Sequence, residues 1–164
     1  LSLGLGSVML ASPTARATIV RWVTEWYETH IVFRYAGEDA PGEMPRYELG
    51  ELPEGFVENL ESQFVGTGMT AHFYENEKGD VILFEYIYMQ QGSLSGVNTE
   101  NAYVISVIVN DCEGLLVIPK EEDSNSMLMW LDPEHDLQFT LDAPLGQEDI
   151  LHMAESVHLV ETMK

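Results

Sequence analysis

Short β-rich runs separated by turn residues fill the chain from His30 to Leu141, and this pattern restricts the fold more than any other feature. β-branched and aromatic runs between clusters of glycine, proline, asparagine and aspartate are typical of antiparallel strands with short connections. The segment Gln90–Asn101 is polar, and we expect a loop there. The expected strands are Ile31–Tyr35, Tyr47–Leu49, Phe56–Phe64, Met69–Tyr74, Asp80–Met89, Tyr103–Val109, Leu115–Ile118, Met127–Leu131 and Leu137–Leu141. The pattern therefore predicts an antiparallel β meander of about six to eight strands.

Turn residues close three of the expected hairpins. They are Glu75–Gly79, Asn110–Gly114 and Asp132–Asp136, each rich in residues that favour tight turns. In the strand Leu137–Leu141, apolar and polar residues alternate, as they do in a strand with one buried face.

A helix is expected at each end of this meander. Ser12 and Pro13 have the residue types of an N-cap and a first helical position, and the helix is predicted to run to about Thr29. Its apolar residues recur at helical spacing: Ala15, Ile19, Trp22, Val23 and Trp26. A closing helix is predicted from about Gln147. The fold class that we predict is α+β, one antiparallel sheet with both helices packed on it.

The first eleven residues form an apolar, uncharged arm. They are too few to span a bilayer, which takes about 20 residues, but they fit the remnant of a membrane or signal segment. Ala15-Arg16-Ala17 has the small-x-small form of a signal-peptidase site, which agrees with that interpretation. The alternative is a buried N-terminal arm. We expect a single domain over residues 12–164.

Acidic residues outnumber basic ones by 28 to 7, and the formal net charge is −21. Nucleic acids and anionic lipid surfaces are bound through clustered lysine and arginine, so this composition argues against both as partners. Cys112 is the only cysteine, which excludes an intrachain disulfide and a cysteine-based zinc cluster.

No catalytic or cofactor motif is recognisable in the sequence. The five histidines lack the spacing of a metal-binding helix, and the glycines lack that of a phosphate-binding loop. Glu85, between Leu83 and Ile87, is a candidate for a half-buried general acid. The commoner role of such a carboxylate is to lie at the sheet margin or to pair with Arg34 or Arg46. We therefore expect no enzyme, no cofactor and no metal.

Two groups of aromatic residues are candidates for binding. Trp22, Trp26 and Tyr27 lie on an expected helix that is apolar on most sides, so they would bind a protein partner or a second copy of the chain in a homodimer. The alternative is a central core helix. A second group, Tyr86, Tyr88 and Trp130, would line an aromatic groove for a ligand, with core packing as the alternative.

Several segments resemble the signature of one bacterial family. Near the C-terminus these are Met129–Asp132, Leu137–Leu141 and Glu148–Ser156. Leu52–Phe56 and the hairpin Tyr74–Phe84 are similar to its earlier part, and Ala11–Ala17 with Trp22 and Trp26-Tyr27 resembles the stretch after its membrane helix. The family is a domain of unknown function on the outer side of membrane-anchored proteins of Gram-positive Firmicutes, several of them anti-sigma-factor-like.

The resemblance implies an extracytoplasmic sensory or interaction domain, held at the cell membrane by a segment upstream. It implies no site residues, because the family has no established site. We therefore expect a non-enzymatic domain that binds a protein partner or a cell-envelope ligand. The alternative is a carrier-like domain with an apolar groove for lipid or peptide, suggested by the two covered faces of the strand Asp80–Met89.

Overall fold

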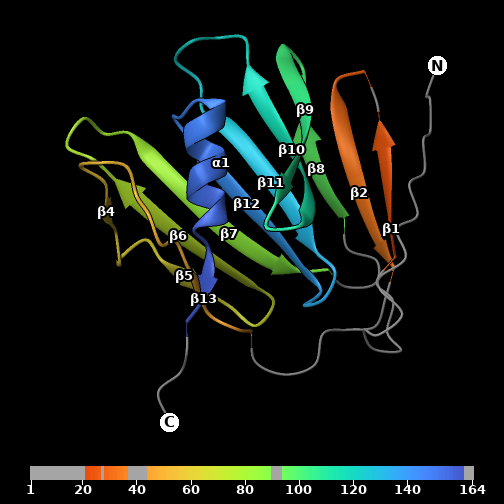
Figure 1. The fold of residues 1–164 in the computed structure, drawn as a ribbon, viewed down its shortest axis with the longest axis horizontal. Coiled ribbons are helices and arrows are strands. Elements are labelled where there is room, and N and C mark those ends of the chain that lie inside the picture. Colours follow the sequence, from red (N-terminus) through yellow and green to blue (C-terminus); the bar gives the residue numbers. More distant parts are fainter. Residues whose placement is uncertain (1–20, 27, 37–43, 90–93, 161–164) are drawn as a thin grey trace.

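The computed structural model describes residues 21–26, 28–36, 44–89 and 94–160, and this part of the chain is mostly β with one helix (Figure 1). Its main sheet has eight strands in the order β4-β6-β7-β12-β11-β10-β9, with β5 also paired to β6. These strands are β4 (Val57–Glu58), β5 (Phe64–Val65), β6 (Met69–Glu75), β7 (Val81–Tyr88), β9 (Ala102–Val109), β10 (Cys112–Pro119), β11 (Ser126–Asp132) and β12 (Leu137–Ala143).

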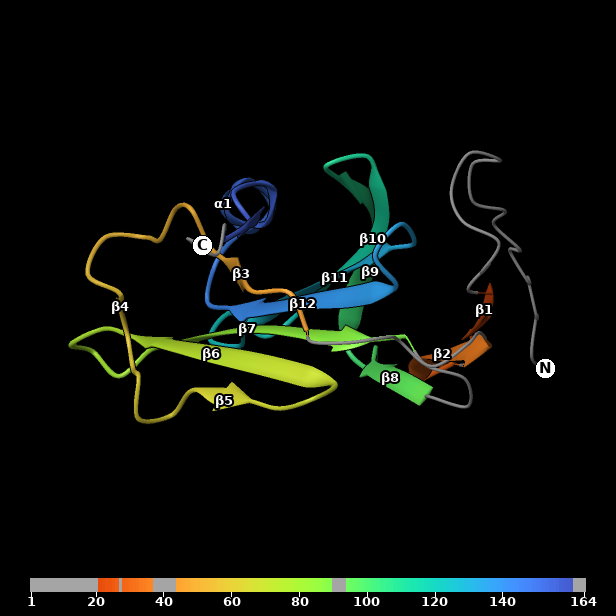
Figure 2. The same cartoon turned by 90° about the horizontal axis from the view of Figure 1, so that it is seen from below.

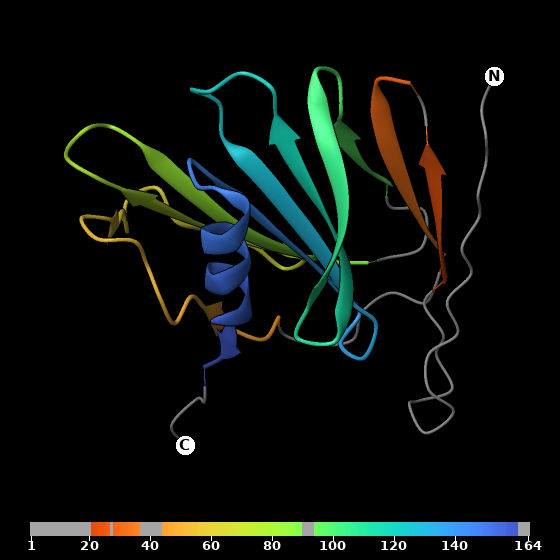
Figure 3. The same cartoon turned by 45° about the horizontal axis from the view of Figure 1, so that its top comes forward.

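A smaller sheet contains β1 (Arg21–Trp26), β2 (His30–Ala36) and β8 (Leu94–Asn98), in the order β1-β2-β8. Figures 1 and 3 show β1 and β2 at the opposite end of the molecule from β4. The helix α1 (Gln147–Glu155) follows the last strand of the main sheet, and the short strand β13 (His158–Leu159) then pairs with β3 (Tyr47–Glu48). Among the described residues, no helix has the length and apolar character that a membrane crossing requires.

The predicted α+β class is wrong, because the expected N-terminal helix is replaced by strands. Of that helix, residues 12–20 lie outside the described residues, but Arg21–Trp26 is β1 and pairs with β2 along its whole length. Four of the six residues, Trp22, Val23, Thr24 and Trp26, are aromatic or β-branched, so the segment suits a strand as well as a helix. Pairing with β2 decides between them, as tertiary context often does.

Two further predictions are wrong in part. The expected loop Gln90–Asn101 contains β8, which is paired with β2 from His30–Asn98 to Arg34–Leu94. The expected strand Phe56–Phe64 is divided into β4 and β5, because Asn59 accepts hydrogen bonds from the amides of Glu61 and Ser62 and so turns the chain. The hairpins β6–β7, β9–β10 and β11–β12 and the helix α1 are confirmed.

Different elements pack on the two faces of the main sheet. Figure 2 shows α1 on one side of β7 and β12, and β8 on the other. The face toward α1 carries the larger core cluster, centred on Phe84, Tyr86 and Phe139, against which Ile150 of the helix packs. The opposite face carries a second cluster that joins the two sheets: Ile31, Phe33, Tyr35, Met89, Val97, Val117, Met129 and Leu131.

Candidate functional site

A cavity of about 360 Å³ lies where the small sheet meets the second face of the main sheet. Ligand pockets range from about 300 to 1,000 Å³, so this cavity is at the small end of that range. Residues of β1, β2, β9, β10 and β11 line it: Trp26, Phe33, Ser106, Val107, Ile108, Glu113, Gly114, Leu115, Met129 and Leu131. The cavity is therefore built from two groups of strands, β1–β2 and β9–β10–β11, that are far apart in sequence.

Strand register explains how these side chains meet. Trp26 is opposite Ile31 and Thr24 is opposite Phe33, so Trp26 and Phe33 belong to the inward face of the small sheet. On the main sheet, Leu115 is opposite Met129, on the face away from α1. The wall facing β1 and β2 is consequently apolar, and Trp26 remains 38% exposed beside it.

The polar side chains of the cavity are few. Ser106 and Glu113 are both exposed at its edge, and no lysine or arginine is found among the described residues that line it. The chain as a whole has a net charge of −21, and Glu113 places one of its carboxylates at this edge. The cavity thus offers an apolar interior and a carboxylate at the rim.

The structure brings one of the predicted partner-binding residues, Trp26, to this cavity. Trp22 is opposite Tyr35 in the β1–β2 register, and its side chain lies outside the described residues, as does Tyr27 altogether. Sequence reasoning missed the other lining residues, because they come from strands whose mutual placement no local pattern encodes. The aromatic and β-branched residues of the segment 21–26 were the signal that could have placed Trp26 on a strand.

The predicted groove residues lie elsewhere. Tyr86, Tyr88 and Trp130 are all buried, on the face of the main sheet that α1 covers. Trp130 stacks on Phe139 with ring centroids 5.1 Å apart, and the Tyr86 hydroxyl accepts a hydrogen bond of 3.1 Å from the Tyr47 amide. Their contacts are those of core aromatics, which agrees with core packing, the alternative to a ligand groove.

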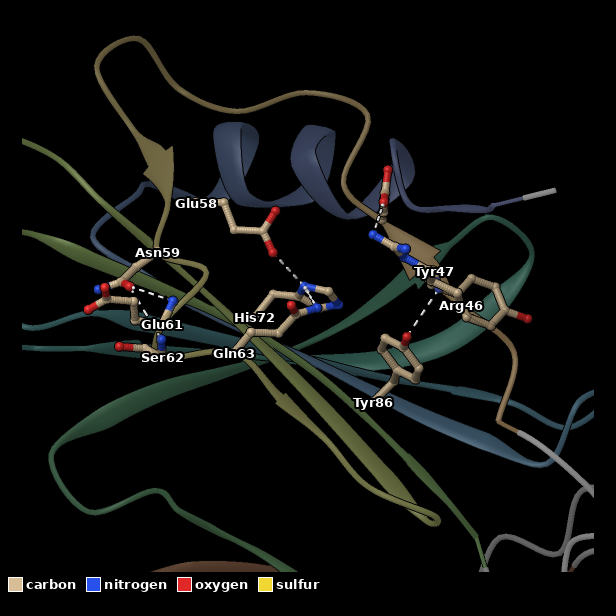
Figure 4. A network of polar contacts seen from close by, with 10 residues as sticks. Arg46, Tyr47, Glu58, Asn59, Glu61, Ser62, Gln63, His72 and Tyr86 are labelled. Atoms are coloured by element: carbon tan, nitrogen blue, oxygen red, sulfur yellow. Dashed lines mark hydrogen bonds and ion pairs between the residues drawn. The ribbon is translucent and has the colours of Figure 1, made fainter. Parts of the chain in front are cut away.

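A polar network on the same face surrounds His72 (Figure 4). The His72 side chain is 1% exposed, and its Nδ1 lies 2.8 Å from Glu58 Oε1 and 3.3 Å from the Gln63 side-chain nitrogen. A carboxylate can only accept, so Nδ1 carries the proton when Glu58 is ionised. His72 Nε2 is buried without a hydrogen-bond partner in the described structure. The network holds β4 and the following turn against β6, and it does not reach the cavity.

A wider, open groove of about 950 Å³ lies beyond this network, between residues 54–61 and the β6–β7 turn. Five glutamates line it: Glu54, Glu58, Glu61, Glu75 and Glu77. Their arrangement is not that of a metal site, since no group of three or more histidine, cysteine or acidic side chains in the described part of the chain is placed to hold a metal ion.

Among the groups whose pKa is raised by burial are one carboxyl and one thiol, the types that serve as a general acid and a nucleophile. Burial raises the pKa of the Glu85 carboxyl, which lies between Ala71 and Thr140 across the sheet. Burial, with Asp132 as the next contributor, raises the pKa of the Cys112 thiol to about 11. A thiol with that pKa is protonated at neutral pH and is a poor nucleophile. The neighbours across the sheet from Glu85 supply no second acid or base.

The fold and the cavity define a class: a mostly β domain in which two antiparallel sheets enclose a small apolar site. The chain belongs to the DUF4367 family, a domain of unknown function, which matches residues 46–157. No curated protein and no solved structure matches the chain. The matched range holds the main sheet, β8 and α1, whereas β1 and β2 precede it. Trp26 and Phe33 of the cavity therefore lie outside the matched range.

Proposed function

We propose that this chain is a non-enzymatic binding domain, and that the cavity between the two sheets is its binding site. The observation that carries the proposal is the position of Trp26, a large aromatic side chain that is partly exposed beside an apolar cavity of about 360 Å³. Exposed tryptophan next to an apolar concavity is characteristic of recognition sites, because its burial by a ligand is strongly favourable.

The biological setting belongs to the same proposal. The apolar arm 1–11 and the resemblance of Ala11–Ala17 to the stretch after a membrane helix support a membrane-anchored protein whose domain faces the outside of the cell. In that setting the domain is the sensory or interaction part of an anti-sigma-factor-like regulator. It would bind a protein partner or a cell-envelope ligand, or a second copy of itself, and pass the signal inward.

The second candidate function is that of a carrier for lipid or peptide, and the same cavity would serve it. The absence of a lysine or arginine among the described lining residues favours a neutral or cationic cargo over a fatty acid or an anionic lipid, because a carboxylate or phosphate head would face Glu113. The two functions differ in what occupies the site, so the first test concerns the site itself.

Titration with Nile red, an uncharged apolar fluorophore, tests whether the cavity binds. We expect saturable binding that Trp26→Ala weakens at least tenfold and that Ser106→Trp, which fills the cavity from β9, abolishes. Tyr103→Ala is the matched control. Tyr103 is an exposed aromatic side chain on β9, the strand of Ser106, and it does not line the cavity. Non-saturable binding by the unmodified domain, or equal losses in Trp26→Ala and Tyr103→Ala, would refute the proposal.

A further inference from the structure

We infer that the cavity takes an apolar, positively charged peptide segment of a partner protein, with a lysine or arginine of that segment against Glu113. This inference rests on the proposed function and deepens it, because it names the chemistry of the occupant. Three properties of the site support it: the carboxylate at its rim, the edge strand that borders it and the apolar character of its floor.

The charge at the opening selects against anionic ligands. Glu113 is exposed and lines the cavity, and Ser106 is the other polar side chain among the described lining residues. A cationic group beside Glu113 would form an ion pair, and the field of a chain with 28 acidic and 7 basic residues would speed its approach. A neutral ligand would gain neither effect, and an anionic one would be repelled.

The cavity borders an edge strand of the main sheet. Three consecutive residues of β9, Ser106, Val107 and Ile108, line the cavity, so the strand's backbone borders it as well as its side chains. β9 ends the main sheet and β1 ends the small sheet, and each has a single strand partner among the described residues. A peptide lying along β9 would pair with the backbone of an edge strand, and edge strands bind extended chains by strand addition.

The floor supplies the apolar part of the recognition. Leu115, Met129 and Leu131 form it, and Ile108 on the rim is 58% exposed. Methionine adapts its shape to different apolar side chains, which suits a floor that receives leucine, valine or phenylalanine from a partner. A segment with two or three such residues and a neighbouring lysine would fill the interior and reach Glu113.

Displacement of Nile red from the intact chain tests this inference with three probes that differ in one residue. The probes are the capped pentapeptides Leu-Val-Phe-Leu-X, in which X is lysine, glutamine or glutamate. At low salt we expect the lysine peptide to bind more tightly than the glutamine peptide and at least tenfold more tightly than the glutamate peptide. Glu113→Gln should weaken the lysine peptide about two- to fivefold, as for an exposed ion pair, and leave the glutamine peptide unchanged. Glu77→Gln, in the exposed β6–β7 turn, is the matched control and should change neither.

The outcomes separate the two proposals. Equal affinity for the three peptides, with Nile red still bound at a Trp26-dependent site, would overturn the cationic partner and keep the proposed function. If Glu113→Gln and Glu77→Gln reduce the preference for the lysine peptide equally, the inference is also overturned. The preference would then come from the net charge of the chain alone. Failure of Nile red and of all three peptides to bind would overturn both.

Discussion

Replacing Gly114 by alanine tests how closely the strands under the cavity must approach. A Cβ at this position of β10 would lie 2.7 Å from the Met129 carbonyl oxygen and 3.0 Å from Trp130 Cβ, both on the neighbouring strand β11. The first contact is with backbone, which cannot rotate away as the end of a flexible side chain can. The strand pair must therefore separate locally, beside the two floor residues Leu115 and Met129.

The expected loss of stability follows from two opposing effects. Forcing an extra methyl group into a packed site costs about 1–3 kcal/mol, whereas replacing glycine by alanine restricts the unfolded chain and returns about 0.4–1 kcal/mol. With the middle of each range, the net expectation is a destabilisation of about 1 kcal/mol for Gly114→Ala. Gly96→Ala in β8 is the matched control, because its Cβ would have its nearest neighbour, the Ile31 carbonyl oxygen, at 3.9 Å. That variant should be as stable as the parent or up to about 1 kcal/mol more stable.

Urea unfolding followed by far-ultraviolet circular dichroism measures both differences at pH 7. The midpoint should fall for Gly114→Ala and stay or rise for Gly96→Ala, with unchanged slopes. Nile red affinity provides a second readout, since a displaced β10–β11 pair would alter the floor of the cavity. Equal midpoints for the two variants would refute the reasoning, because the close approach of β11 would then carry no energetic consequence.

Three further outcomes concern buried polar and titratable groups. Tyr35 donates a buried hydrogen bond to the Gln138 amide oxygen across the two sheets, so Tyr35→Phe should lower the unfolding free energy by about 1–3 kcal/mol; an unchanged value would mean that this bond does not stabilise the sheet contact. Glu85 has a raised pKa, and the stability that it contributes at low pH is lost as the pH rises through that pKa. Glu85→Gln should therefore be more stable than the parent at pH 7 and equal to it at pH 3. The exposed Glu75→Gln is the control and should match the parent at both pH values. The pKa of Cys112 is raised from 9.0 to about 11, so the domain should lose stability as the pH rises from 9 to 11, and Cys112→Ala should lose less over that interval. Parallel curves of unfolding free energy against pH for the two proteins would exclude this thiol as a source of the loss.

The hairpins of the main sheet were predictable because their signals are local. β6 and β7 are joined at Asn76–Asp80, where the Asn76 side chain accepts hydrogen bonds from the Lys78 and Asp80 amides, and such turns are visible as clusters of turn-forming residues. The β9–β10 connection is tighter than the sequence suggested. Asn110 and Asp111 have φ of 46° and 66°, so these two residues make the turn and β10 begins at Cys112.

The small sheet was not predictable from its own residues. β8 contains Gly96 and polar neighbours, and it is a strand because it pairs with β2, a contact between residues that are far apart in sequence. β1 has apolar residues at helical spacing but aromatic and β-branched residue types that favour a strand, and nothing within residues 21–26 decides between the two structures. The sequence could therefore indicate an important aromatic at Trp26, but it could not indicate the cavity that this residue lines.

The family match covers only one side of the apolar cluster between the two sheets. The matched residues 46–157 include Met89, Val97, Val117, Met129 and Leu131, which are buried in the cluster between the sheets. Their partners Ile31, Phe33 and Tyr35 precede the match and are themselves 4% exposed or less. Burial of large apolar and aromatic side chains contributes about 1.5–3 kcal/mol each, so the matched region alone would expose a costly apolar surface. The β1–β2 hairpin is thus part of the folded unit, and the proposed binding site exists because this hairpin covers the second face of the main sheet.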